Sequence, residues 1–244
     1  MLMHLEYKVR LPDHDWSVGS RHKLTPSVYA AVEVKDNCMG QKEAVTYSGP
    51  TYIAIRSCKH SSSTASTHAK DLDKLYSLPD FDPILKGEDG KAKPVHMISV
   101  DGGPDENPRY KKVIAHGITH FINRDLDALF VYTNAPGNSA FNEVERRLAH
   151  LSKRAAGLVL QHNHYGNHLD GNGRTIDKEL ELSNFRFAGE TLAEVWSELT
   201  FDGFGVTAEF VPSDEVLPNP LDVSDEWYAN HVRESQYLLQ VIFF

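Results

Sequence analysis

Two short apolar runs, each followed by a helical pattern, are the sequence feature that most constrains the fold of this chain. Residues 94–100 read PVHMISV and residues 128–132 read ALFVY, a composition typical of buried strands. After each run, apolar residues recur at helical spacing, first between Tyr110 and Ile122 and then between Val144 and Ala155. The alternation of strand and helix predicts a sheet covered by helices.

Three further strands are predicted upstream. Residues 1–10 alternate between apolar and charged side chains, and residues 27–34 and 51–56 are rich in β-branched and aromatic residues. The hydroxyl run at 61–64 offers helix N-caps ahead of another apolar stripe. Meander strands followed by alternating helices and strands imply a mixed α/β sheet flanked by helices, an order that resembles the RNase H fold. We expect the strand that ends at Val100 at the centre of this sheet, with the helix that carries Val144, Leu148 and Leu151 packed on it.

The rest of the chain is expected to form an α-rich C-terminal extension. A helix is predicted over residues 184–199, a strand over 206–211 and a last helix over 227–242. Gly157 is a plausible helix C-cap, so we place a domain boundary there. The predicted domains are residues 1–157, of RNase H-like type, and residues 158–244.

Composition narrows the class of protein. The net charge of −9 weighs against a generic nucleic-acid binder, although basic residues cluster locally at Arg146, Arg147, Lys153 and Arg154. The two cysteines supply neither a disulfide framework nor a four-cysteine zinc site. No apolar run approaches the ~18 residues of a membrane span, and no signal peptide is recognisable. We expect an intracellular protein, for which the nucleus is one possible location, although the sequence has no clear targeting signal. No membrane partner is expected.

Two carboxylates form the first candidate site. Asp101 ends a buried-type strand, where open α/β sheets place their sites, and Glu145 stands in the first turn of a later helix. Carboxylates from different elements can hold Mg²⁺ or Mn²⁺ for phosphoryl transfer, so we expect these two to approach within about 8 Å of each other. Structural roles are the alternative: Asp101 precedes two glycines and can shape a turn, while Glu145 can form a capping box with Asn142.

A histidine-rich loop is the second candidate. His162, His164, His168 and Asp170 follow the pattern H-x-H-x₃-H-x-D, which could supply three imidazoles and a carboxylate to Zn²⁺. The alternative is an ordered polar loop, because the chain has 13 histidines and local clusters arise by chance.

The stretch SVDGGPDEN at residues 99–107 resembles the second-aspartate segment of DDE integrases and transposases. The stretch APGNSAFNEVERR at 135–147 is similar to their third-carboxylate segment, in which Asn-x-x-Glu opens the last helix. The chain also resembles uncharacterised, transposon-derived eukaryotic proteins through the segments HKLTPSVYA, SVDGGPDENPRY, HLDGNGRTID and HVRESQYLLQ. The resemblance implies metal-dependent DNA chemistry at Asp101 and Glu145.

One catalytic position of that family is unmatched. The resemblance puts the first aspartate on a strand upstream of Met1, and Asp13 and Asp15 are poor substitutes because they follow a strand at a turn. We therefore expect a fragment or remnant with its first strand missing, weak DNA binding and no catalysis. The alternatives are a domesticated RNase H-like module that binds nucleic acid or protein, and an unrelated α/β domain that uses the histidine loop.

Overall fold

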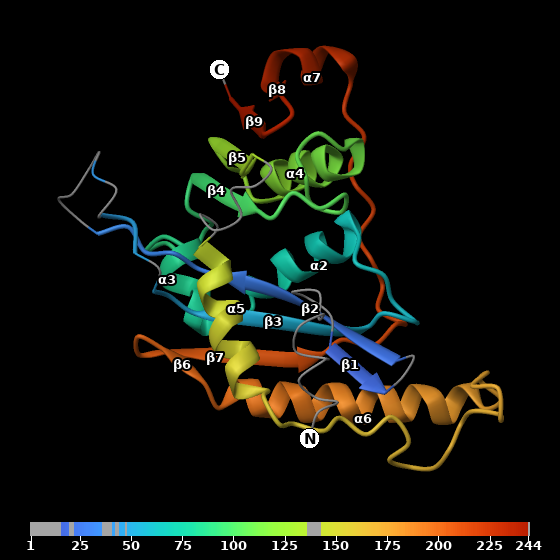
Figure 1. Ribbon diagram of the computed structural model, residues 1–244. Helices are drawn as coiled ribbons and strands as arrows, with labels where there is room; N and C mark the ends of the chain where they lie inside the picture. The colour runs from blue at the N-terminus through green and yellow to red at the C-terminus, as the bar shows by residue number, and fades with distance from the viewer. Residues whose placement is uncertain are drawn as a thin grey trace. The chain divides into compact units, whose positions relative to one another are not determined.

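The computed structural model describes residues 16–19, 22–35, 41, 44–46, 48–135 and 143–243, and only the backbone of residues 16–19, 22, 143, 145 and 146. Within these ranges the chain forms two mixed sheets flanked by helices (Figure 1). The predicted mixed α/β class is confirmed. The strand predicted at residues 1–10 lies outside the described residues.

The chain divides into two compact units, each assembled from separate segments. Unit 1 combines Met1–Tyr29, Thr51–Ser62 and Arg147–Glu215, and unit 2 combines Ala30–Pro50, Ser63–Arg146 and Val216–Phe244. The boundary predicted after residue 157 falls inside the last segment of unit 1.

The sheet of unit 1 has the strand order β1-β2-β3-β7-β6. β1 and β2 pair antiparallel, whereas β3 and β7 are parallel, with Thr51 opposite Val206. β6 and β7 form a tight hairpin. The strands are β1 (Trp16–Gly19), β2 (His22–Ala30), β3 (Thr51–Ser57), β6 (Thr200–Phe201) and β7 (Phe204–Phe210).

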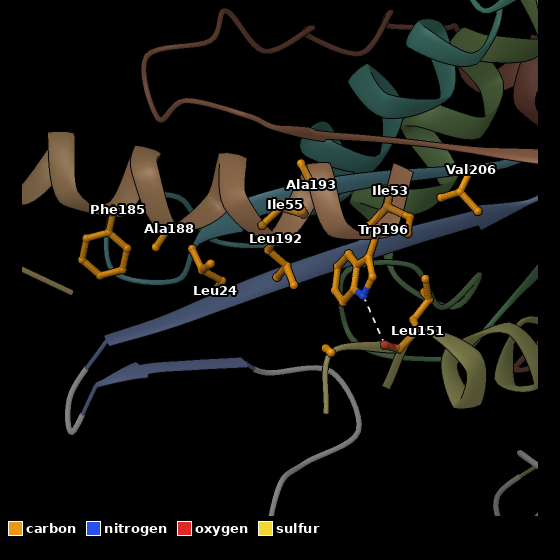
Figure 2. Packing of buried hydrophobic residues seen from close by; sticks show 11 residues of the cluster. Leu24, Ile53, Ile55, Leu151, Phe185, Ala188, Leu192, Ala193, Trp196 and Val206 are labelled. Carbon is orange, nitrogen blue, oxygen red and sulfur yellow. Dashed lines mark hydrogen bonds between the residues drawn. The ribbon is translucent and has the colours of Figure 1, made fainter. Parts of the chain in front are cut away.

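Two helices, α5 (Glu143–Arg154) and α6 (Lys178–Ser197), supply apolar side chains to the core of unit 1. Figure 2 shows Trp196 of α6 donating a hydrogen bond from Nε1 to the carbonyl oxygen of Leu151 in α5, at 3.2 Å. Gly189 lets α6 approach β7, because a Cβ there would lie 2.2 Å from the ring of Phe210. The helix that carries Leu151 was expected to pack on the sheet that contains the strand at 94–100, but Leu151 belongs to the unit 1 core.

The sheet of unit 2 has the order β4-β5-β9-β8. β4 and β5 are parallel, while β9 runs antiparallel to β5. Its core unites α4, β5, β8 and β9 around residues such as Phe121, Leu129 and Leu239. The elements are α2 (Ala65–Leu75), η2 (Pro79–Phe81), α3 (Asp82–Leu85), β4 (Val95–Val100), α4 (Lys111–Asn123), β5 (Ala128–Thr133), α7 (Asp225–His231), β8 (Val232–Glu234) and β9 (Leu238–Ile242).

Two expectations about this sheet are wrong. The strand at 94–100 was expected at the centre of a mixed sheet, but β4 lies at an edge because β9 occupies the other side of β5. The helix predicted over 227–242 stops at His231, and β8 and β9 follow as a hairpin. A short apolar run fits strand and helix alike, and pairing of Val241 with Leu129 selects the strand.

The other predicted elements are largely in place. β3, β5 and β7 occupy the predicted runs, and α2 begins after Thr64, which forms a capping box with Thr67. Among the described residues, no helix combines the length and apolar character needed to cross a membrane.

Candidate functional site

Asp101 directly follows β4, at the carboxyl ends of two parallel strands. Its side chain is exposed. Gly102 has a φ of +92°, and a Cβ there would lie 2.5 Å from Thr133 Oγ1, so this turn requires glycine. Asn107 donates from Nδ2 to the carbonyl oxygen of Gly102 at 3.3 Å. The turn shape and the Asn107 bond together hold the backbone that carries the Asp101 carboxylate.

Thr133 is the last residue of β5 and lies opposite Val100, at the same carboxyl ends of the two parallel strands. The residue is 7% exposed, and its Oγ1 has no hydrogen-bond partner within the described part of the chain. An unsatisfied buried hydroxyl costs about 1–3 kcal/mol. Thr133 therefore adds an available oxygen beside the turn that follows Asp101, and the sequence reading did not single it out.

The same loop anchors an imidazole from α2. His68 Nε2 lies 3.1 Å from Asp105 Oδ2 and 3.0 Å from Ser63 Oγ. Burial lowers the pKa of His68, but the hydrogen bond to Asp105 and the negative charges of Glu106 and Asp105 outweigh burial and raise it. The hydrogen bond from His68 in turn holds the pKa of Asp105 far below its usual range. The pair is thus a partly exposed ion pair that ties the loop to α2.

Glu145 lies in the first turn of α5, but its side chain and residues 136–142 are outside the described residues. The expected approach of the Asp101 and Glu145 carboxylates to within about 8 Å therefore stays a prediction. Asp13 and Asp15 also lie outside the described residues.

The basic cluster predicted on α5 is smaller than expected. Arg147 is only 3% exposed, and its Nη1 donates to Thr51 Oγ1 at 2.6 Å. Burial lowers the pKa of Arg147. Arg154 forms an ion pair with Glu198, and Lys153 and Arg154 are both exposed. Arg147 supports the fold of unit 1 and is unavailable to a phosphate backbone.

The three loop histidines have different environments. His164 stacks on Phe187, with ring centroids 3.5 Å apart and an interplanar angle of 9°. His168 is fully buried, accepts from Asn184 Nδ2 at 3.0 Å and lies 6.4 Å, centroid to centroid, from His162. Within the described ranges no three His, Cys, Asp or Glu residues are placed to hold a metal ion. The Zn²⁺ site at His162, His164 and His168 and the alternative of an ordered polar loop both stay predictions.

Comparison with known proteins found no match: no protein-family model, no curated protein and no solved structure matches the chain. The resemblance to DDE proteins therefore stays an expectation that rests on the quoted segments.

A buried network around Glu181 was missed by the sequence reading. Glu181 accepts from Lys59 Nζ at 2.5 Å and from Thr175 Oγ1 at 2.5 Å, and its Oε1 lies 2.9 Å from His60 Nε2. Burial raises the pKa of Glu181, but these hydrogen bonds outweigh it and lower the pKa to about 2. Ser57 Oγ lies 2.7 Å from His60 Nδ1, which completes a hydroxyl–imidazole–carboxylate chain.

This chain of groups has the composition of a nucleophilic triad but not its accessibility. Ser57 is 3% exposed and Glu181 is 2% exposed, so a substrate cannot reach the hydroxyl. The network instead ties the end of β3 to α6 and to the loop that contains Thr175. Ser57 and His60 are only three residues apart, but Glu181 lies 121 residues from His60, so nothing in the sequence pairs them.

Proposed function

We propose that the chain is an RNase H-like domain of the DDE transposase and integrase type, now catalytically silent, that retains a weak site for Mg²⁺ or Mn²⁺. One observation carries the proposal: Asp101 is an exposed carboxylate at the carboxyl ends of the parallel strands β4 and β5. Open α/β sheets place their sites at this edge. The segments that resemble DDE proteins include both Asp101 and Glu145.

The order of elements supports the proposal, whereas the sheets depart from the expected single sheet. β1 to β3 are followed by α2, β4, α4, β5 and α5, the order expected for an RNase H-like domain. β4 and β5, however, share no sheet with β1 to β3. The proposal therefore concerns the evolutionary origin of the chain and the position of its carboxylates, and it does not require a single RNase H-like sheet.

DNA is proposed only as a weak, salt-sensitive partner. The net charge is −9, and Arg147 is withdrawn from the basic cluster by burial. The cluster on α5 therefore offers fewer cations to displace the counterions of a phosphate backbone, which is the main source of non-specific affinity.

We expect no metal-dependent cleavage of DNA by the 244-residue chain. Two-metal phosphoryl transfer needs ligands that bridge both cations, and the resemblance assigns only two carboxylates. The measurement is nicking of supercoiled plasmid with Mg²⁺ or Mn²⁺, beside the variant Asp101→Asn. Nicking that this variant abolishes would mean that the site is complete and the domain active.

Mn²⁺ should nevertheless bind weakly at Asp101. With few carboxylate ligands, a dissociation constant on the order of 1 mM is expected. Titration followed by electron paramagnetic resonance should show that Asp101→Asn weakens binding at least about fivefold, roughly 1 kcal/mol. The control is Glu88→Gln, an exposed carboxylate elsewhere in unit 2. Equal binding by both variants would show that Asp101 is not a cation ligand.

A further inference from the structure

β4 is an edge strand without the usual protection. It is outermost in its sheet, and no described strand pairs with its outer side. Exposed edges are normally blunted by charges, proline or bulges, but Val95–Val100 reads VHMISV and contains neither charge nor proline. Such an edge is a template for pairing with another strand.

The backbone groups on this edge can be assigned from the pairing with β5. The carbonyl oxygen of Pro94 accepts from Asp127 N at 2.8 Å and from Ala128 N at 3.1 Å, so it faces β5. Backbone groups of successive residues alternate in direction along a strand. The N–H and C=O groups of Val95, Met97 and Ser99 therefore face away from β5.

In the first half of β4, the side chains of the residues whose backbone groups face away from β5 are exposed to solvent. Val95 is 51% exposed and Met97 is 70% exposed, whereas His96, the residue between them, is buried. An exposed apolar edge of this kind favours a partner strand that covers Val95 and Met97.

We propose that β4 pairs antiparallel with β4 of a second copy of this chain, around a two-fold axis at Met97. The two four-stranded sheets then become one continuous sheet. This interface is isologous, so it closes at a dimer and does not propagate into a fibre.

Charge complementarity selects a second copy as the occupant and fixes the register. With Met97 opposite its own symmetry mate, Val95 stands opposite Ser99, and all three outward-facing residues find backbone partners. Lys93 and Asp101 flank β4, four residues on either side of Met97, so each Lys93 lies at the same end of the paired strands as an Asp101 of the other copy. Lys93 Nζ donates to the carbonyl oxygen of Pro83 at 2.6 Å, and the exposed Asp101 carboxylate can approach it. Opposite charges across an antiparallel pair stabilise it.

Sedimentation equilibrium of the full chain tests the proposal. The wild type should dimerise, and Met97→Lys, which places two ammonium groups face to face, should raise the dimer dissociation constant at least about tenfold. The matched control is Ile176→Lys in unit 1, because Ile176 is also 70% exposed. A wild type that stays monomeric at ~200 µM, far above a micromolar dissociation constant, or a Met97→Lys variant that dimerises normally, overturns the proposal.

The register has its own test. Asp101→Lys should weaken the dimer, and the exchange Lys93→Asp with Asp101→Lys should restore it; failure to restore it overturns the antiparallel arrangement.

Amide hydrogen exchange shows whether a different segment pairs with β4. If Val95, Met97 and Ser99 amides are protected in a monomer, a segment of the same chain covers this edge and the proposal is wrong. The two proposals share the Asp101 carboxylate, but the dimer needs no bound cation, and Met97→Lys tests it without changing Asp101.

Discussion

Lowering the pH from 7 to 5 will destabilise unit 2 by about 3 kcal/mol. The reason is a pair of buried imidazoles, His96 on β4 and His120 on α4, each 7% exposed. His96 Nδ1 lies 3.1 Å from His120 Nε2, and the Tyr76 hydroxyl lies 3.3 Å from His96 Nδ1.

The surroundings of this pair favour the neutral imidazoles. Burial lowers the pKa of His96 to about 4, with further lowering by Arg124 and Lys93. Burial lowers the pKa of His120 to about 3, and the charges of His96 and Arg124 lower it further. The Arg124 guanidinium lies 3.7 Å from the Tyr76 ring centroid, and its ion pair is with Asp73.

The direction of the pH effect follows from these pKa values. Both folded-state values lie below the ordinary 6.5, so the unfolded chain takes up protons first as the pH falls. The stability that the neutral pair contributes is present above about pH 6.5 and is lost progressively as the pH falls towards the folded-state pKa values of about 4 and about 3. The lowered pKa values of His116 and His168 act in the same direction, and the raised pKa of His68 acts in the opposite one. The lowered pKa of Glu181 matters only at lower pH.

Urea unfolding at pH 7 and pH 5, followed by circular dichroism, measures the effect. The double variant His96→Gln and His120→Gln should lose most of the pH dependence, whatever its stability at pH 7. His164→Gln is the control, because that histidine is exposed and lies in unit 1. An unchanged pH dependence in the double variant would refute the assignment.

Trp196→Ala will destabilise unit 1 by about 4 kcal/mol. Trp196 is 1% exposed and packs with Leu192, Ile53 and Leu151 in the core that Figure 2 shows. Its removal creates a cavity between α5 and α6 and also leaves the Leu151 carbonyl without the indole N–H.

The matching measurement is the urea midpoint at pH 7. Val159→Ala serves as the control, because Val159 is 79% exposed and its truncation should change stability by less than about 0.5 kcal/mol. Trp196→Phe, which keeps most of the apolar volume, should fall between the two. A loss below about 1 kcal/mol for Trp196→Ala would mean that the core collapses around the missing ring.

Local patterns in the sequence were sufficient for much of the framework. The apolar runs of β3, β4 and β5 and the cap at Thr64 are read from neighbouring residues, and each element formed there. The position of Asp101 at the end of a strand was predictable for the same reason. The hydrophobic period, helix caps and glycines act over a few residues, so they can be recognised in a single sequence.

Tertiary structure decided the neighbours of these elements. Pairing of β9 with β5 placed β4 at an edge, although the short apolar run Leu238–Ile242 had also allowed a helix. His68 finds Asp105 over 37 residues, and His60 finds Glu181 over 121 residues. Arg147 was expected in a basic cluster on α5, but packing buried it beside Thr51. Such contacts depend on how elements dock, and no local period or spacing encodes which distant side chain will complete a buried hydrogen bond.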